Sequence, residues 1–256
     1  MKGNRRAAKT ILLENQMFFG VSRAAYRGVL RAYNRVHRLL DRKRSPYFDL
    51  YLYVDPQTIQ LKTEIDSNKF RDIGKVQAGD WDLDVISFQE VYHYYGSLRS
   101  VLIHGGKWED TELFHSGLER IGSGLTAWGC RNLPELRKRV DSIAQLFAAI
   151  RDHGYKFPAT RKINGLSDEV SAHIGRSGEL LFEDGGHRLT IAQLLKLKSI
   201  PVQVTLRHAN WDAIRRRALP SAPNCRTGDL PRPTHPDIAS VYKYLETMNH
   251  TPPPPN

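Results

Sequence analysis

Residues 179–208 read ELLFED-GGHR-LTIAQLLKLKS-IPVQVTLRH, and this stretch decides the fold. Glu179 to Glu183 has the apolar pattern of a strand, and Gly185–Gly186 are typical of a turn. Leu189 to Leu197 predicts a short apolar helix, and Ile200 to Leu206 predicts a buried strand. This order indicates an α/β (mixed α+β) domain with a small mixed sheet and flanking helices.

The glycine turn has the features of an anion site. Two glycines before a helix let the backbone approach a ligand, and the first helical amides are left to bind an anion. His187 and Arg188 add hydrogen-bonding or cationic side chains there, and a guanidinium binds phosphate through two parallel hydrogen bonds. We therefore predict phosphate or nucleotide binding at Gly185, Gly186, His187 and Arg188. The alternatives are a simple tight turn and a histidine that caps the helix.

Further candidate residues lie before and after this turn. Asp184 is a candidate Mg²⁺ ligand or base, although an aspartate here equally often accepts backbone hydrogen bonds in the turn. Arg207 follows the last strand, and we expect it beside the turn, with a solvated side chain as the alternative. Trp108 and Glu109 occupy a glycine loop suited to substrate binding by stacking and hydrogen bonding, or to a helix cap beside a half-buried tryptophan.

The order Asp184-Gly-Gly-His-Arg188, followed by an apolar helix and Ile200-Pro201-Val202, resembles the ParB/sulfiredoxin superfamily. In that superfamily a G-x-H-R or G-E-R-R turn between a strand and a helix holds phosphate groups. The close match covers about thirty residues, and weaker similarity extends from about Tyr51 to Trp211. The resemblance implies a ParB/sulfiredoxin-like domain.

Differences from the better-known branches narrow what the resemblance implies. Sulfiredoxins carry a catalytic cysteine in the turn, where this chain has Gly186, so we do not expect a sulfiredoxin. Partition-type ParB proteins have a glutamate where His187 stands, and a downstream helix-turn-helix domain. The D-G-x-H-R form is closest to ParB-like free serine kinases. That likeness implies a Mg²⁺-dependent phosphotransferase using ATP, ADP or CTP on a small hydroxyl compound. An upstream acid serves as base in those kinases, which implies Glu169, with Asp184 as the alternative.

The positive charge is concentrated at the N-terminus. The 256-residue chain has a net charge of +11, and residues 1–44 hold twelve basic and two acidic residues. Between Phe18 and Arg42, arginines recur on one face and apolar residues on the opposite face, which predicts a basic amphipathic helix. This arm packs on the protein's own core, contacts an anionic membrane surface, or binds nucleic acid. The last case gives the alternative function, a ParB-like regulatory protein that binds DNA.

We expect three segments: an arm at 1–46, the domain at 47–212, and a Pro-rich extension at 213–256. The domain contains a helical insertion at about 84–153, with helices predicted at Phe88–Leu102, Asp110–Ile121 and Leu133–His153. No apolar run approaches the roughly 20 residues of a membrane span. The two cysteines, Cys130 and Cys225, have no metal-binding spacing. A reduced cytoplasmic location is expected, with the membrane surface as the alternative for the arm.

Overall fold

The computed structural model describes residues 51–67, 72–92, 94–156, 169–218 and 234–249, with the backbone alone for 244–249. The basic helix predicted within residues 1–46 lies outside these ranges. The described strands are β1 Leu52–Val54, β2 Leu61–Thr63, β3 Lys75–Gln77, β4 Val85–Ser87, β5 Ser171–Ile174, β6 Leu180–Asp184 and β7 Ile200–His208. The described helices are α3 Phe88–Val91, α4 Tyr94–His104, α5 Glu112–Gly122, α6 Leu133–His153, α7 Gly186–Leu194, α8 Ala209–Ala218 and α9 Pro236–Asn249, with 3-10 turns η1 Pro56–Thr58 and η2 Trp108–Asp110.

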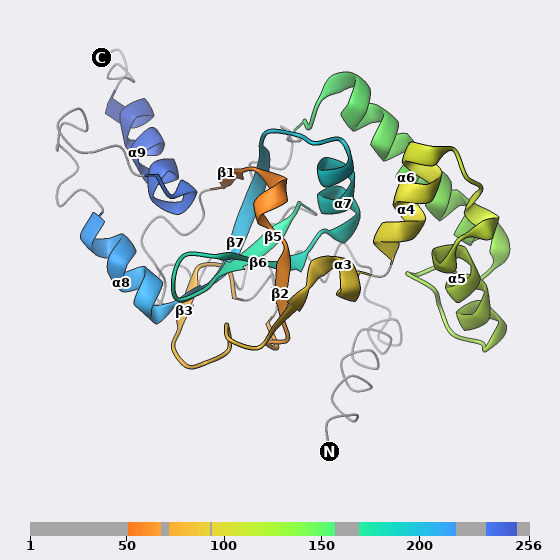
Figure 1. Cartoon of the computed structure of the whole chain (residues 1–256), viewed down its shortest axis with the longest axis horizontal. Helices are drawn as coiled ribbons and strands as arrows, with labels where there is room; N and C mark the ends of the chain where they lie inside the picture. The colour runs from red at the N-terminus through yellow and green to blue at the C-terminus, as the bar shows by residue number, and fades with distance from the viewer. Residues whose placement is uncertain (1–50, 68–71, 93, 157–168, 219–233, 250–256) are drawn as a thin grey trace, which may run out of the picture.

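The strands form one mixed seven-stranded sheet in the order β1-β7-β5-β6-β2-β4, with β3 also paired to β7. β7 pairs with β1 antiparallel through its first half and with β3 parallel through its last residues. β5 runs parallel to β7 and antiparallel to β6. In Figure 1 the sheet lies in the middle, with α4, α5 and α6 at one end and α8 and α9 at the other. The predicted mixed α/β class is confirmed.

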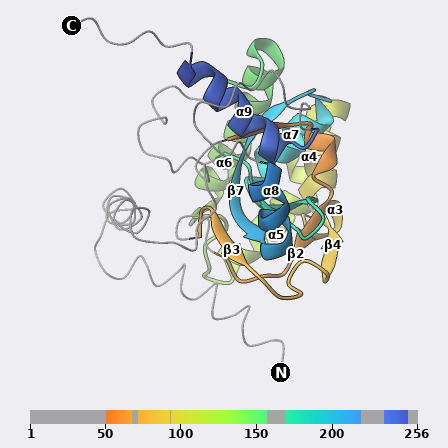
Figure 2. The same ribbon diagram turned by 90° about the vertical axis from the view of Figure 1, so that its left-hand side faces the viewer.

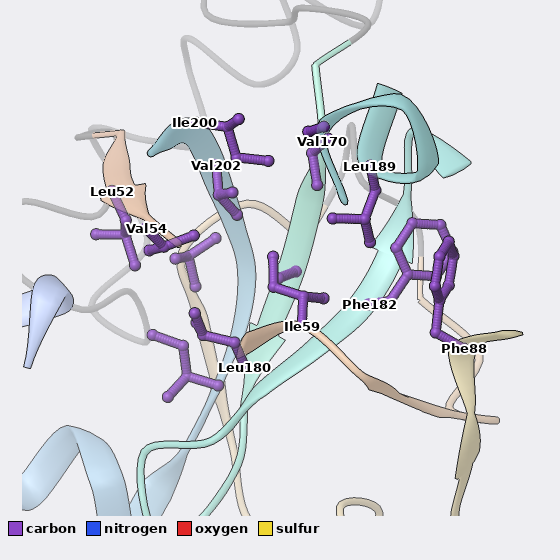
Figure 3. Close-up of a cluster of buried hydrophobic side chains, with 14 of the residues drawn as sticks. Leu52, Val54, Ile59, Phe88, Val170, Leu180, Phe182, Leu189, Ile200 and Val202 are labelled. Atoms are coloured by element: carbon purple, nitrogen blue, oxygen red, sulfur yellow. The ribbon is translucent and has the colours of Figure 1, made fainter. Parts of the chain in front are cut away.

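Helix α7 packs between the sheet and the inserted helices, so it is apolar on two faces. Leu189 joins the buried cluster of the sheet together with Val170 and Phe182, whereas Ile191 joins the cluster formed by α4, α5 and α6. Figure 3 shows Leu189 reaching the sheet between Val170 and Phe182. Full burial of each such leucine or isoleucine contributes about 1.5–3 kcal/mol, which fixes α7 and therefore its first turn.

Helix α6 has the boundaries that its local sequence predicts. The Asn132 Oδ1 accepts a hydrogen bond from the Glu135 amide, and the Glu135 carboxylate accepts one from the Arg131 amide, both at 2.9 Å. This arrangement resembles a capping box. Gly154 ends the helix with φ +73°, a conformation that favours glycine. The predicted helix Phe88–Leu102 is instead interrupted after α3, and α4 starts at residue 94.

Helices α8 and α9 cover the edge of the sheet at β1 and β7 (Figure 2). Trp211 of α8 and Ile238 of α9 belong to the buried cluster of the sheet, and Val241 of α9 is completely buried. The described part of the expected C-terminal extension thus adds to the core of the domain. No helix in the described ranges has the combination of length and apolar character that crossing a bilayer requires.

Candidate functional site

The turn after β6 is fixed by a left-handed glycine. Gly185 has φ +88°, which L side chains rarely adopt. Asp184 Oδ1 accepts a hydrogen bond from the Gly185 amide at 2.7 Å, the turn-forming role that the sequence left open. A Cβ on Gly185 would lie 2.8 Å from the Cα of Val170 and 3.1 Å from the carbonyl oxygen of Glu169. The turn therefore packs directly on the residues that lead into β5.

Arg188, in the first turn of α7, forms an ion pair with Glu169. Its Nη1 lies 3.1 Å and 3.2 Å from the two carboxylate oxygens. Glu169 is only 1% exposed, and the Tyr155 hydroxyl also donates to its Oε2 at 2.6 Å. The Arg188 side chain keeps 21% of its surface exposed. The guanidinium is thus held from the protein side by a buried carboxylate and still reaches solvent.

His187 lies against the ring of Tyr92 and does not carry the positive charge that the sequence allowed. Its ring meets the Tyr92 ring edge-on, with centroids 5.8 Å apart. Burial and, after it, the charge of Arg139 lower the pKa of His187 to about 4, against the opposing carboxylate of Asp184. His187 is therefore neutral at pH 7, and the positive charge of the turn comes from Arg188 alone among residues 184–188.

The second glycine is required by packing. A Cβ on Gly186 would lie 2.5 Å from Cε2 of Tyr92. Tyr92 follows α3 with non-helical φ −93° and ψ 63°, and its ring stacks on Phe88 at 5.4 Å. We expected both glycines to leave space for a ligand. The space beside Gly186 is instead filled by the tyrosine ring, which leaves the helix axis as the direction from which we consider a ligand.

Along that axis the first turn presents backbone amides. The first backbone hydrogen bond of α7 runs from the Leu189 amide to the Gly185 carbonyl at 3.0 Å. The amides of residues 186–188 precede it, and these are the groups that a helix leaves for a capping group or an anion. Asp184 is exposed at the same end of the helix.

A cation at this turn would depend on ligand oxygens as well as on the protein. Among the described residues, no group of three His, Cys, Asp or Glu side chains comes together as a metal site. Mg²⁺ is usually held by one or two carboxylates together with phosphate and water oxygens. The single exposed carboxylate of Asp184 fits that mode and does not fit an all-protein metal site.

Arg207 does not belong to this site, contrary to the sequence-based expectation. It lies opposite Ile174, which pairs with Leu180 at the start of β6, whereas the glycine turn follows the end of β6. At about 3.3 Å per residue, the length of β6 separates the two positions by about 13 Å. The reason is strand direction, because β7 is parallel to β5 and β5 is antiparallel to β6. Arg207 is completely buried and forms an ion pair with Asp237 at 2.6 Å.

Trp108 and Glu109 also lie apart from the turn. Trp108 starts η2 and packs on the buried cluster of α4, α5 and α6, and the Glu109 carboxylate lies 3.7 Å from Arg137. Thr111 accepts a hydrogen bond from the Phe114 amide and caps α5. In the described part of the chain, neither Trp108 nor Glu109 has a hydrogen bond, ion pair or ring contact with residues 184–188. The alternative interpretation, a helix cap beside a half-buried tryptophan, describes this loop.

Three residues near the turn were not found by sequence reasoning. Tyr155 follows the last turn of α6 and donates to Glu169. Tyr92 covers Gly186, and Arg139 of α6 lies near enough to affect the pKa values of Tyr92 and His187. Of these three, only Tyr155 is marked by its local sequence, because Gly154 ends α6 and Tyr155 is the first residue after it. The other two reach the turn only through helix packing.

Comparisons with protein families, with curated proteins and with solved structures find no match to this chain.

Proposed function

We propose that the first turn of α7 binds the phosphate groups of a nucleotide. We further propose that the protein is a ParB/sulfiredoxin-like, Mg²⁺-dependent phosphotransferase acting on a small hydroxyl compound. The observation that carries the proposal is the ion pair between Glu169 and Arg188. It holds a partly exposed guanidinium that belongs to the same first turn as the amides of residues 186–188. Fixed donors of these two kinds are suited to phosphate oxygens. The β6–α7–β7 order supports the resemblance on which the family assignment rests.

The geometry favours Asp184 over Glu169 as the reactive carboxylate. Both oxygens of Glu169 accept hydrogen bonds from Arg188, and Tyr155 donates to one of them. A buried carboxylate in this state is suited to positioning the arginine and poorly placed to accept a substrate proton. Asp184 is exposed at the end of the helix where the phosphate would lie.

Each role follows from the chemistry of the transfer. The acceptor hydroxyl oxygen forms a bond to the terminal phosphorus, the bond from that phosphorus to the bridging oxygen breaks, and the hydroxyl proton passes to Asp184. Arg188 and the helix amides bind the phosphate oxygens and balance their charge. Mg²⁺, when bound, would neutralise phosphate charge, with Asp184 as its protein ligand.

Calorimetry with ATP, ADP and CTP in the presence of Mg²⁺ tests the binding step. Wild-type protein is expected to bind at least one of them below millimolar concentration. Arg188→Lys keeps a positive charge beside buried Glu169 but loses the planar donor group, and it should weaken binding about tenfold or more. Arg151→Lys, at an exposed pair with Asp152, serves as the control and should leave affinity unchanged. If none of the three nucleotides binds at millimolar concentration, the proposal is wrong.

The transfer step needs a separate measurement. Phosphorus NMR of a nucleotide incubated with Mg²⁺ and small hydroxyl compounds, free serine first, should show a new phosphate ester. Asp184→Asn should abolish that product while nucleotide binding without Mg²⁺ remains. An Asp184→Asn variant with wild-type turnover would remove Asp184 from the reaction.

The concentrated charge of residues 1–44 supports one alternative function, DNA binding by a ParB-like regulatory protein. Affinity for DNA should then fall steeply with salt and disappear when residues 1–44 are removed. Liposome sedimentation with the same truncated chain distinguishes an anionic membrane surface as the partner. DNA binding that is absent or independent of salt would contradict this alternative.

A further inference from the structure

His235 immediately precedes α9 and connects the start of that helix to the turn between β5 and β6. Its Nδ1 accepts a hydrogen bond from the Asp237 amide at 3.1 Å. Its Nε2 lies 2.8 Å from the carbonyl oxygen of Gly178, which can only accept a hydrogen bond, so Nε2 carries the proton. The two contacts together require a neutral ring with hydrogen on Nε2 alone.

Protonation of His235 would remove one of these two contacts. A proton on Nδ1 takes the place of the lone pair that accepts from the Asp237 amide, so the first turn of α9 loses its cap. The proton also brings positive charge to the N-terminus of a helix, where the helix dipole disfavours a cation. Acid therefore weakens the attachment of α9.

The surroundings of His235 favour the neutral ring while α9 is attached. Burial is the largest influence and lowers the pKa of His235; the charges of Arg207 and Arg215 act in the same direction, against the Gly178 carbonyl and the Asp237 carboxylate. Both arginines are completely buried and bind Asp237, at 2.6 Å and 3.0 Å. A ring that leaves this environment takes up a proton more readily, so lower pH favours the detached helix.

His208 makes the equivalent contacts at the start of α8 and provides an internal comparison. Its Nδ1 accepts from the Asn210 amide at 3.1 Å, and its Nε2 lies 2.8 Å from the Gly79 carbonyl oxygen. The charged group beside this ring is a carboxylate, because Asp82 Oδ1 lies 3.9 Å from the same Nε2 and 2.8 Å from Arg176. A positive charge on His208 would thus have an opposite charge next to it.

Helix α9 lies across the free edge of the sheet at β1. Among the described strands, β1 is the last in the sheet order and pairs with β7 alone. Ile238 belongs to the buried cluster that contains Leu52, and the Nζ of Lys243 lies 5.5 Å from the centroid of the Tyr53 ring. Leu52 and Tyr53 point to opposite faces of the strand, so α9 reaches both sides of β1 (Figure 2).

We infer that α9 is an acid-sensitive cover of the β1 edge, held in place by neutral His235 and released when that ring takes up a proton. Release exposes the backbone groups at the free edge of β1, and an uncovered edge strand offers those groups to another chain. The cover does not depend on nucleotide binding at the glycine turn.

Hydrogen exchange of the full chain, measured by mass spectrometry at low urea concentrations, tests the release. After correction for the intrinsic pH dependence of exchange, the α9 amides should exchange faster by up to about tenfold per pH unit between pH 7 and pH 5, because release takes up one proton. The Asp237 carboxylate stays ionised over this range, since its pKa is far below the ordinary value. Exchange at α9 should also depend on urea much less than exchange at α6, because a local opening exposes little surface.

Two matched variants assign the acid response to one ring. His235→Asn keeps a side chain that caps a helix and does not titrate in this range, so the acid response of α9 should disappear. His208→Asn replaces the equivalent ring at the start of α8 and should leave the acid response of α9 unchanged. In wild type, the nitrogen chemical shifts of His235 at pH 7 should show hydrogen on Nε2 alone.

Several outcomes would overturn the inference. Exchange at α9 that is equal at pH 7 and pH 5 in wild type, or an acid response that survives in His235→Asn, would show that His235 does not control the cover. Equal dependence on urea at α9 and α6 would show that α9 opens only with the whole domain. Loss of the response in His208→Asn would place its origin at α8, and hydrogen on Nδ1 of His235 would contradict the cap itself. Far-UV circular dichroism of each variant confirms that it is folded.

Discussion

Arg207 and Asp237 form a completely buried ion pair, with hydrogen bonds of 2.6 Å and 2.9 Å between the guanidinium and the carboxylate. The same carboxylate lies 3.0 Å from Arg215 Nε and accepts a hydrogen bond from Trp211 at 3.0 Å. Burial alone would raise the pKa of Asp237. The charge and hydrogen bonds of Arg207, followed by Arg215 and Trp211, hold that pKa far below its ordinary value. One aspartate thus joins β7, α8 and α9.

Asp237→Asn should therefore destabilise the protein by about 3–5 kcal/mol, because it leaves buried arginine charge without its carboxylate. The matched control is Asp152→Asn, at an exposed pair with Arg151, which should leave the free energy of unfolding close to that of wild type. Urea unfolding gives both values.

The depressed pKa of Asp237 means that its stabilisation of the fold is present above the unfolded-state pKa of about 4 and is lost as the pH falls further. Equal stability of the two variants would contradict the role of Asp237.

The Arg207–Asp237 pair is a contact that the sequence alone does not predict. The boundaries of α6 were predictable because Asn132, Pro134 and Gly154 act within one turn of the helix ends. Nothing local indicates that Arg207 meets a carboxylate thirty residues later. The order and direction of strands in the sheet are equally non-local. The prediction for Arg207 was wrong because β7 runs antiparallel to β6, with β5 between them.

The closeness of Glu169 to the glycine turn follows from the pairing of two strands. β5 and β6 form an antiparallel hairpin, so the residue before β5 lies beside the residue after β6. The strand from Glu179 to Glu183 was predicted from the sequence, and its pairing with β5 places Glu169 near Arg188. The sequence did not indicate that Glu169 is buried and bound by Tyr155, because that depends on how α6 ends against the sheet.

Gly185→Ala should be among the most damaging single substitutions in the domain. The new Cβ would be in a left-handed conformation and would lie 2.8 Å from backbone, which cannot rotate away as a side chain can. We expect the left-handed conformation and the close approach together to lower the free energy of unfolding by about 2–4 kcal/mol. Gly96→Ala is the control, since a Cβ there meets nothing within 4 Å on the exposed face of α4. It should be neutral or stabilise by up to about 1 kcal/mol. Thermal denaturation of both variants measures the difference, and a Gly185→Ala variant as stable as wild type would contradict the packed turn.

Because of the low pKa of His187, the free energy of unfolding should decrease as the pH is lowered from 7 towards 4. This pKa is about 4 in the folded protein and about 6.5 when unfolded, so between these values the unfolded state binds more protons. Stability therefore falls as the pH is lowered from 7, and the His187 contribution at pH 5 is a loss of about 2 kcal/mol. Urea unfolding at pH 7 and pH 5 measures it. His187→Gln should lose correspondingly less stability over the same range, and equal losses in both proteins would show that His187 is not responsible.

Tyr155→Phe should lower the free energy of unfolding more than Tyr242→Phe does. Each substitution removes one hydroxyl that makes a hydrogen bond inside the protein. The Tyr155 hydroxyl donates to the carboxylate of Glu169 at 2.6 Å, whereas the Tyr242 hydroxyl donates to the neutral carbonyl of Ala218 at 2.8 Å. Hydrogen bonds to a charged acceptor contribute about 1.5–3 kcal/mol, and neutral ones about 0.5–1.5 kcal/mol. Removing the first also takes a hydrogen bond from the buried carboxylate that holds Arg188, so we expect the guanidinium to be held less firmly and nucleotide affinity to fall in Tyr155→Phe alone. Urea unfolding together with calorimetry separates the two effects. Equal stabilities with unchanged nucleotide binding would show that Tyr155 does not support the Glu169–Arg188 pair.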